Sequence, residues 1–167
     1  CSHINGHWAR SYHEYCASMN IIAGQGDGTF APDAPVTGAA AAKMLLVALG
    51  YDADIAGYQG ADWDLNVNRD ANEAKLYEEI KTIDTSAGLS RDNTAQMAYN
   101  ALDAKIMERT DHKVVGTGEV SYTYEQSKTT TFLNKYFDAL TFIGSFEGNY
   151  NTQATGTKGY IAVKGRL

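Results

Sequence analysis

The stretch VTGAAAAKMLLVAL at residues 36–49 aligns without a gap with LSRDNTAQMAYNAL at residues 89–102. Self-similarity of this kind indicates an internal repeat, and its apolar spacing predicts a helix in each copy. Thr37 and Ser90 are the predicted N-caps, and Gly50 is the predicted left-handed stop of the first copy. Four aligned pairs carry the same residue: Ala42 and Ala95, Met44 and Met97, Ala48 and Ala101, and Leu49 and Leu102.

A second pair of similar segments lies upstream of these helices, at an offset of 55 positions. Its members are Trp8, Tyr12, Cys16 and Met19, which align with Trp63, Val67, Ala71 and Ala74. The spacing i, i+4, i+8, i+11 places each set on one face of a helix, so we expect a first helix over residues 7–19. Each unit is therefore predicted to be helix, loop, helix. Neither unit alone buries a satisfactory core, so we expect the units to pack on one another.

The pattern changes in the last third of the chain. Alternating apolar and polar residues predict strands at residues 114–124, 140–150 and 159–165, with a short helix within 129–139 and a linker near 108–113. The predicted fold class is α+β. Its parts are a repeat at residues 1–51 that is truncated at its start, a divergent repeat at 52–107, and a β-rich module at 114–167 with an incomplete sheet.

Composition excludes several classes of protein. Apolar residues make up 44% and charged residues 20% of 167 residues, which is typical of a folded chain. The net charge of -6 argues against nucleic acid as a partner, and no apolar run reaches the ~20 residues of a membrane span. Eleven tyrosines, together with many Thr, Asn, Gly and Ser and few Lys, suggest an extracellular or carbohydrate-facing surface. Cys1 and Cys16 could pair in an oxidising compartment, but we favour Cys16 as a small apolar residue on a helix face.

The loop GQGDGTFAPD at residues 24–33 has the composition of a ligand-binding loop. Counted from Asp27, a calcium-hand loop would need oxygen ligands where Thr29 and Ala31 stand. A phosphate loop would need a lysine, which the segment lacks. We therefore interpret it first as a structural turn, in which Gly28 permits positive φ and Phe30 enters the core between the helices.

These segments resemble S-layer homology repeats, the wall-anchoring modules of Gram-positive surface proteins. The first unit carries GHWA at residues 6–9, the loop IIAGQGDGTFAPDAPVT at 21–37, and an alanine-rich helix that ends in ALGY. The second carries ADW at 61–63 and LSRDNTAQM at 89–97. The resemblance covers residues 1–107. It implies three repeats in a pseudo-threefold arrangement, whose grooves bind secondary cell-wall polysaccharide that often bears pyruvate.

The resemblance also implies candidate binding residues. The family's second helix often begins Thr-Arg-Ala-Glu; the first unit has Thr-Gly-Ala-Ala at residues 37–40, whereas the second has Ser-Arg-Asp-Asn at 90–93. A sugar site is therefore expected at Arg91, whose fork can hold a carboxylate, unless Arg91 is only a solvated charge. Trp8 and Trp63 either stack on sugar or pack between helices. The full candidate set is Trp63, Arg91, Asp92, Trp8, Gly24, Asp27 and Gly28.

Catalytic motifs are missing from the sequence. The four histidines, at positions 3, 7, 13 and 112, form no HExxH pattern, and no GxSxG element occurs. We predict an extracellular, non-enzymatic module of a cell wall or S-layer, without cofactor or metal. Its partner is secondary cell-wall polysaccharide, in many family members a pyruvylated one. The alternative is a structural assembly module that associates with itself or with sister surface proteins. The anchor portion of a secreted hydrolase is a third interpretation.

Overall fold

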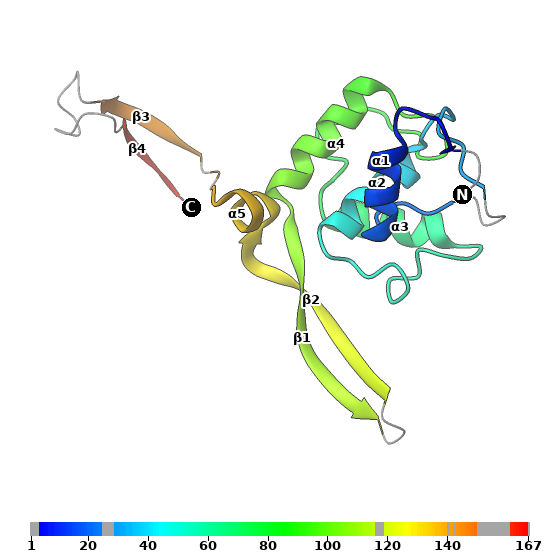
Figure 1. Cartoon of the computed structure of the whole chain (residues 1–167). Helices are drawn as coiled ribbons and strands as arrows, with labels where there is room; N and C mark the ends of the chain where they lie inside the picture. The colour runs from blue at the N-terminus through cyan, green and yellow to red at the C-terminus, as the bar shows by residue number, and fades with distance from the viewer. Residues whose placement is uncertain are drawn as a thin grey trace. The chain divides into compact units, whose positions relative to one another are not determined.

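Four helices form two consecutive helix–loop–helix pairs within the compact unit Cys1–Phe132, as Figure 1 shows. The pairs are α1 (Arg10–Ser18) with α2 (Gly38–Ala48), and α3 (Trp63–Glu73) with α4 (Arg91–Asp103). The structure is a computed structural model that describes residues 4–24, 29–115, 119–139, 141, 143–149 and 161–166. Helices and antiparallel strands together confirm the α+β class.

The starts of α2 and α4 are capped as the sequence predicts. The Thr37 hydroxyl accepts a hydrogen bond from the Ala40 amide at 3.2 Å, and the Ser90 hydroxyl accepts one from the Asn93 amide at 3.1 Å. Each bond satisfies one of the amides that the first helical turn leaves without a partner.

Gly50 ends α2, as predicted, with a φ of 98°. The amide of Gly50 donates to Val47 O, and that of Tyr51 donates to Leu46 O, which is the Schellman pattern. A Cβ at Gly50 would also lie 2.9 Å from the carbonyl oxygen of Met107. Glycine is therefore required here both by the backbone angle and by the chain that crosses it.

Helices α1 and α3 end in the same way, 55 positions apart. Asn20 and Lys75 have φ of 57° and 60°, and the residues after them, Ile21 and Leu76, donate to the carbonyls of Cys16 and Ala71 at 2.9 Å. Both stops therefore repeat the Schellman bonds, although neither residue is glycine. The first helices of the two pairs therefore end with the same hydrogen bonds, and the second helices begin with the same kind of cap.

The hydrophobic core lies among α2, α3, α4 and the segments that join them. Helix α2 packs along α3 and less extensively on α4. The largest fully buried side chains are Tyr58, Leu46, Leu49, Leu76, Met97, Ile106 and Val67. Tyr58 and Leu76 come from connecting segments, where helical periodicity does not predict burial.

Helix α1 contributes little to this core. Its one buried residue is His13, and Cys16 is a half-buried thiol on this helix. Cys1 lies outside the described residues, so the alternative of a Cys1–Cys16 pair is not tested. Phe30, expected in the core, is instead half-buried and packs edge-on against His13, with ring centroids 4.1 Å apart. The expectation was wrong because α1 stands outside the core, so the loop after it packs on α1.

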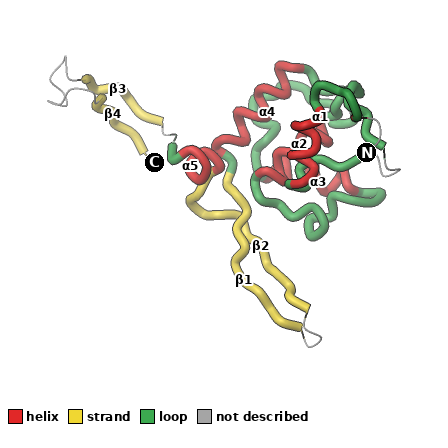
Figure 2. The backbone as a smooth tube through the Cα atoms, in the orientation of Figure 1, coloured by secondary structure: helices red, strands yellow, loops and turns green. Residues whose placement is uncertain are grey.

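A long hairpin follows α4 directly. Strands β1 (Lys105–Val115) and β2 (Glu119–Thr131) pair antiparallel, as Figure 2 shows. The predicted linker near 108–113 is therefore wrong, and the single strand predicted at 114–124 is the junction of two strands. Gly116 and Gly118 were the sequence signal for a turn there; residues 116–118 lie outside the described residues. The base of the hairpin joins the core through Ile106 and the partly buried Phe132.

The remaining compact region, Leu133–Leu167, contains most of helix α5 (Phe132–Phe137) and a second hairpin. Strand β3 (Ile143–Asn149) pairs antiparallel with β4 (Ile161–Arg166). These strands fall within or beside the ranges predicted at 140–150 and 159–165. Helix α5 lies within the predicted range 129–139, and residues 129–131, all threonine, remain in β2. β-branched residues favour an extended strand.

Candidate functional site

The starts of α2 and α4 are held close together by the chain that precedes each of them. The amide of Leu89 donates to Val36 O at 2.8 Å, and the amide of Ala39 donates to Thr85 O at 2.9 Å. An isolated antiparallel bridge joins Thr37 to Gly88 between these bonds. The aligned segments at residues 36–49 and 89–102 therefore begin close to one another.

Gly38 explains why the first of these segments lacks an arginine. The residue is buried, and a Cβ there would lie 3.0 Å from the Cα of Thr85. That distance is too short for any larger side chain unless the backbone shifts. The segment at 84–88 covers this position, so only the second unit presents a side chain at the motif's basic position.

Arg91 is the first residue of α4 and its side chain is exposed. Among the described residues, nothing forms a hydrogen bond or ion pair with its guanidinium. Asp92 is also exposed in the first turn. The helix dipole favours Asp92 there and disfavours the cation of Arg91. An unpaired guanidinium at this position is available to an anionic ligand.

Trp63 begins α3 and is half-buried, packed against the core. The Lys43 ammonium lies 5.6 Å from the centroid of the indole and donates to Tyr58 O at 2.8 Å. Burial lowers the pKa of Lys43, and the charge of Asp54 opposes that shift. Trp63 thus packs partly against the core, and the ammonium of Lys43 lies close to its ring.

Lys43 was missed by the sequence analysis. It is the one charged residue of α2, in an otherwise apolar and alanine-rich segment, and that isolation was a usable signal. No hydrogen bond, ion pair or ring contact among the described residues joins Trp63 to Arg91. The two candidate residues therefore occupy separate positions, one at the start of each helix of the second unit.

Trp8 lies in a different environment from Trp63. It precedes α1 and is 81% exposed, so packing between helices is wrong for this residue. Its ring contacts His7 at 5.6 Å and Tyr12 at 6.3 Å between centroids. These three rings form an aromatic row at the start of α1, in which Trp8 and Tyr12 are exposed and His7 is half-buried.

The loop at 24–33 is described only in part. Gly24 is exposed, whereas Asp27 and Gly28 lie outside the described residues. In the second half of the loop, residues 29–34 line a shallow open depression, and His7 Nε2 lies 3.3 Å from Asp33 Oδ1 at its edge. No described contact links this depression to Arg91 or Trp63.

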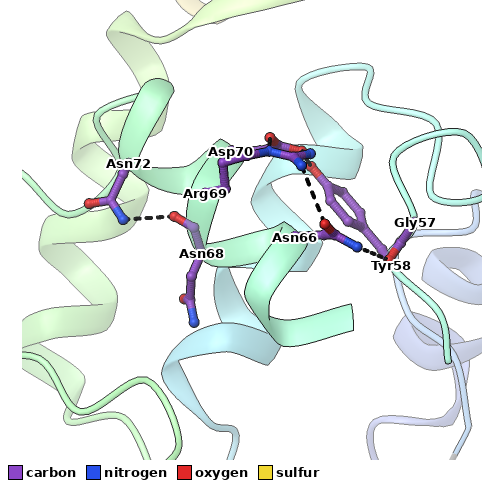
Figure 3. Close-up of polar contacts among 7 residues, drawn as sticks. All are labelled: Gly57, Tyr58, Asn66, Asn68, Arg69, Asp70 and Asn72. Atoms are coloured by element: carbon purple, nitrogen blue, oxygen red, sulfur yellow. Dashed lines mark hydrogen bonds and ion pairs between the residues drawn. The ribbon is translucent and has the colours of Figure 1, made fainter. Parts of the chain in front are cut away.

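A polar network on α3 holds the segment before it in place (Figure 3). The buried carboxylate of Asp70 accepts a hydrogen bond from the Tyr58 hydroxyl at 2.8 Å and two from Arg69, at 2.7 and 3.2 Å. Asn66 Nδ2 donates to Gly57 O at 3.0 Å. Burial is the main cause that raises the pKa of Tyr58, followed by its bond to Asp70. All these groups are satisfied by one another, so we assign the network a structural role.

The same network positions Lys43. Tyr58 binds Asp70 through its hydroxyl and Lys43 through its carbonyl, and its ring stacks on Tyr51 with centroids 6.4 Å apart. Anchoring Tyr58 therefore places the ammonium of Lys43 at the Trp63 ring.

Comparison with protein families gives one match, and it falls on the first helix pair. Residues 2–42 match the family model of the S-layer homology domain. This part of the chain is an S-layer homology domain by that match. The matched range runs from before α1 to the middle of α2 and includes the whole loop at 24–33. No curated protein and no solved structure matches the chain.

S-layer homology domains are generally non-catalytic modules that attach proteins to the cell surface. Within the described ranges, no three His, Cys, Asp or Glu side chains are grouped as a bound metal ion would require. None of the helices in the described part of the chain has the length and hydrophobicity needed to cross a bilayer. The S-layer homology domain thus associates this protein with the cell surface.

Proposed function

We propose that this S-layer homology protein anchors its parent chain to secondary cell-wall polysaccharide, and that the start of α4 is the binding site. The observation that carries the proposal is the exposed guanidinium of Arg91, which has no partner among the described residues. A pyruvate ketal or another sugar acid offers the carboxylate that an arginine fork binds through two hydrogen bonds.

The divergent unit at 52–107 carries the site in this proposal. Its cap at Ser90 and its helix stop at Lys75 correspond to Thr37 and Asn20 of the first unit. It alone has a basic residue, Arg91, directly after the cap. The exposed part of Trp63, with Lys43 beside it, is a second subsite where a sugar ring could stack and a carboxylate could pair. Gly24, Asp27, Gly28 and Trp8 belong to the first unit, and they would border the polymer only if it extends beyond the second unit.

The test is co-sedimentation of the chain with Gram-positive wall sacculi, before and after acid removal of their secondary polymers. We expect binding that is lost on acid treatment. Arg91→Ala should weaken it at least tenfold, and Arg91→Lys should restore it only in part, because a lysine cannot form the bidentate pair. Arg10→Ala is the matched control, since Arg10 is exposed but already paired with Glu14 at 2.7 Å.

Fluorescence gives a second readout of the same site. The chain has two tryptophans, so Trp8→Phe leaves Trp63 as the sole reporter. Soluble polymer should then change the Trp63 emission, and Lys43→Gln should weaken that response. Unaltered binding by Arg91→Ala, together with an unresponsive Trp63, would show that the start of α4 is not the binding site.

A further inference from the structure

A short segment ahead of α4, residues 84–88, contacts both α2 and α3, and we call it the strap. On the α2 side, its backbone carbonyls accept two hydrogen bonds. Thr85 O accepts from the Ala39 amide at 2.9 Å, and Ala87 O accepts from the Gly38 amide at 3.3 Å. These two amides belong to the first turn of α2, where the helix supplies no acceptor of its own. The strap is therefore tied to the start of α2 by backbone atoms alone.

The turn within the strap is set by Asp84. Its Oδ1 accepts hydrogen bonds from the Ser86 amide at 2.9 Å, the Ser86 hydroxyl at 2.6 Å and the Ala87 amide at 3.3 Å. The bonds from Ser86 hold the pKa of Asp84 below its usual value, so the carboxylate stays charged and accepts these bonds at neutral pH. The strap thus has a defined shape, and its place in the fold depends on what holds it from outside.

Asn68 holds the strap from the α3 side. Its half-buried side chain donates from Nδ2 to Thr85 Oγ1 at 3.1 Å, and its Oδ1 accepts from the Tyr77 hydroxyl at 2.7 Å. Its backbone carbonyl accepts from the Asn72 side chain on the same helix, as Figure 3 shows. The bond from Tyr77 orients the Asn68 amide with its donor toward the strap. Among the described residues, no other hydrogen bond joins the strap to α3.

The strap leads directly into the residues that start α4. After it, the Leu89 amide donates to Val36 O at 2.8 Å, Ser90 caps the helix, and Arg91 is the first helical residue. A guanidinium binds a carboxylate through two parallel hydrogen bonds, which requires placement to within about 10–20°. A shift of the strap would turn the backbone that carries Arg91, and the paired bonds would be lost before a single one is.

We propose that Asn68 is a positioning residue for the polymer site at the start of α4. Its bond to Thr85 fixes the strap, and the strap fixes the direction in which Arg91 leaves the helix. Asn68 itself does not touch the polymer. The proposal rests on the proposed function, because Arg91 must be the binding group, and it deepens it. A site built to this precision selects a planar carboxylate over a ligand that offers only a single charge.

The experiment measures co-sedimentation of the full chain with wall sacculi for variants on each side of the bond. Thr85→Val removes the accepting hydroxyl at nearly constant volume and leaves the Thr85 carbonyl on Ala39. Together with Asn68→Ala, it should weaken binding about two- to tenfold, the equivalent of one net hydrogen bond. Thr85→Ser keeps the hydroxyl and should bind like the wild type. Asn72→Ala is the matched control, since that asparagine of α3 bonds only to its own helix.

Two readouts separate positioning from a general loss of stability. In an Arg91→Lys background, Thr85→Val should have little further effect on binding, because an ammonium forms no bidentate pair. A general loss of stability would weaken binding equally in both backgrounds. Amide hydrogen exchange should become faster at Ala39 and Leu89 in Thr85→Val, and it should stay unchanged at Met97 in the interior of α4.

The outcomes distinguish this proposal from the proposed function. If Arg91→Ala weakens binding but Thr85→Val and Asn68→Ala bind like the wild type, the positioning role is overturned and the polymer site stands. Equal losses in both backgrounds also overturn it. If Arg91→Ala binds like the wild type, the polymer site is wrong and the positioning role falls with it. Thr85→Val leaves the bond between Tyr77 and Asn68 in place, so it carries the test even if Asn68→Ala does not fold.

Discussion

The bond between Tyr58 and Asp70 allows a quantitative test of how the core is assembled. Tyr58 is fully buried, Asp70 is 6% exposed, and the hydroxyl lies 2.8 Å from Oδ2. Tyr58→Phe removes this donor without changing the volume of the ring. A hydrogen bond to a charged group contributes about 1.5–3 kcal/mol. Because Arg69 still donates twice to the carboxylate, we expect a loss near the lower end, about 1.5 kcal/mol.

Asp70→Ala should cost more. It leaves the Tyr58 hydroxyl buried without an acceptor, at about 1–3 kcal/mol. It also removes the pair with Arg69, whose side chain is 63% exposed, so that this contribution is at most about 1 kcal/mol. The expected total is about 2–4 kcal/mol. In the double variant no hydroxyl is left unsatisfied, so its cost should fall below the sum by about 1.5 kcal/mol.

The assay is urea unfolding of the wild type, both single variants and the double variant, followed by circular dichroism. Tyr15→Phe, at an exposed tyrosine of α1, is the control and should change the free energy of unfolding by less than about 0.5 kcal/mol. A coupling energy below about 0.5 kcal/mol between positions 58 and 70 would refute the reasoning, because additive effects mean that the two groups do not stabilise one another.

Three further predictions follow from the local geometry. Gly50→Ala should destabilise the chain by about 1–2 kcal/mol because of the positive φ, and further because its Cβ would clash with the Met107 carbonyl of β1. Gly60 also has a positive φ but has open space around it, so Gly60→Ala should show only the cost of the φ in thermal melts. Ser90→Ala should cost about 1 kcal/mol of stability, and Ser90→Asp should restore most of it. If thermal melts of both variants match the wild type, the Ser90 hydroxyl does not stabilise the start of α4. Burial raises the pKa of Tyr51 and of Tyr77 to about 12, above the value near 10 expected in the unfolded chain. The unfolded state therefore ionises first, so stability should be complete below pH ~10 and fall as the pH rises toward 12; phenylalanine at both positions should reduce the slope of stability against pH.

The candidate binding site could be predicted in part. An N-cap residue marks where a helix begins, so Ser90 in the sequence predicts that Arg91 and Asp92 lie in the first turn of a helix. The structure has them there. It could not show that Gly38 is covered by the backbone of Thr85, because that contact joins segments almost 50 positions apart. Lys43 beside Trp63 depends in the same way on a contact between two helices.

Trp8 and Trp63 show the limit of reasoning from a repeat. The two residues align and have the same helical spacing, yet Trp63 packs on the core and Trp8 is exposed. The burial of a helix face depends on which neighbour covers it. Helix α3 has α2 as its neighbour, whereas α1 has no comparable contact among the described elements.

The sequence by itself determined the features that depend on residues within one or two helical turns. These are the N-caps at Thr37 and Ser90, the stop at Gly50, and the order helix, loop, helix in both units. They follow from backbone hydrogen bonds and φ preferences that act locally. Only the tertiary structure decided that Tyr58 is at the centre of the core and that β1 follows α4 without a linker. Burial and strand pairing join distant residues, and a local pattern does not specify its partner.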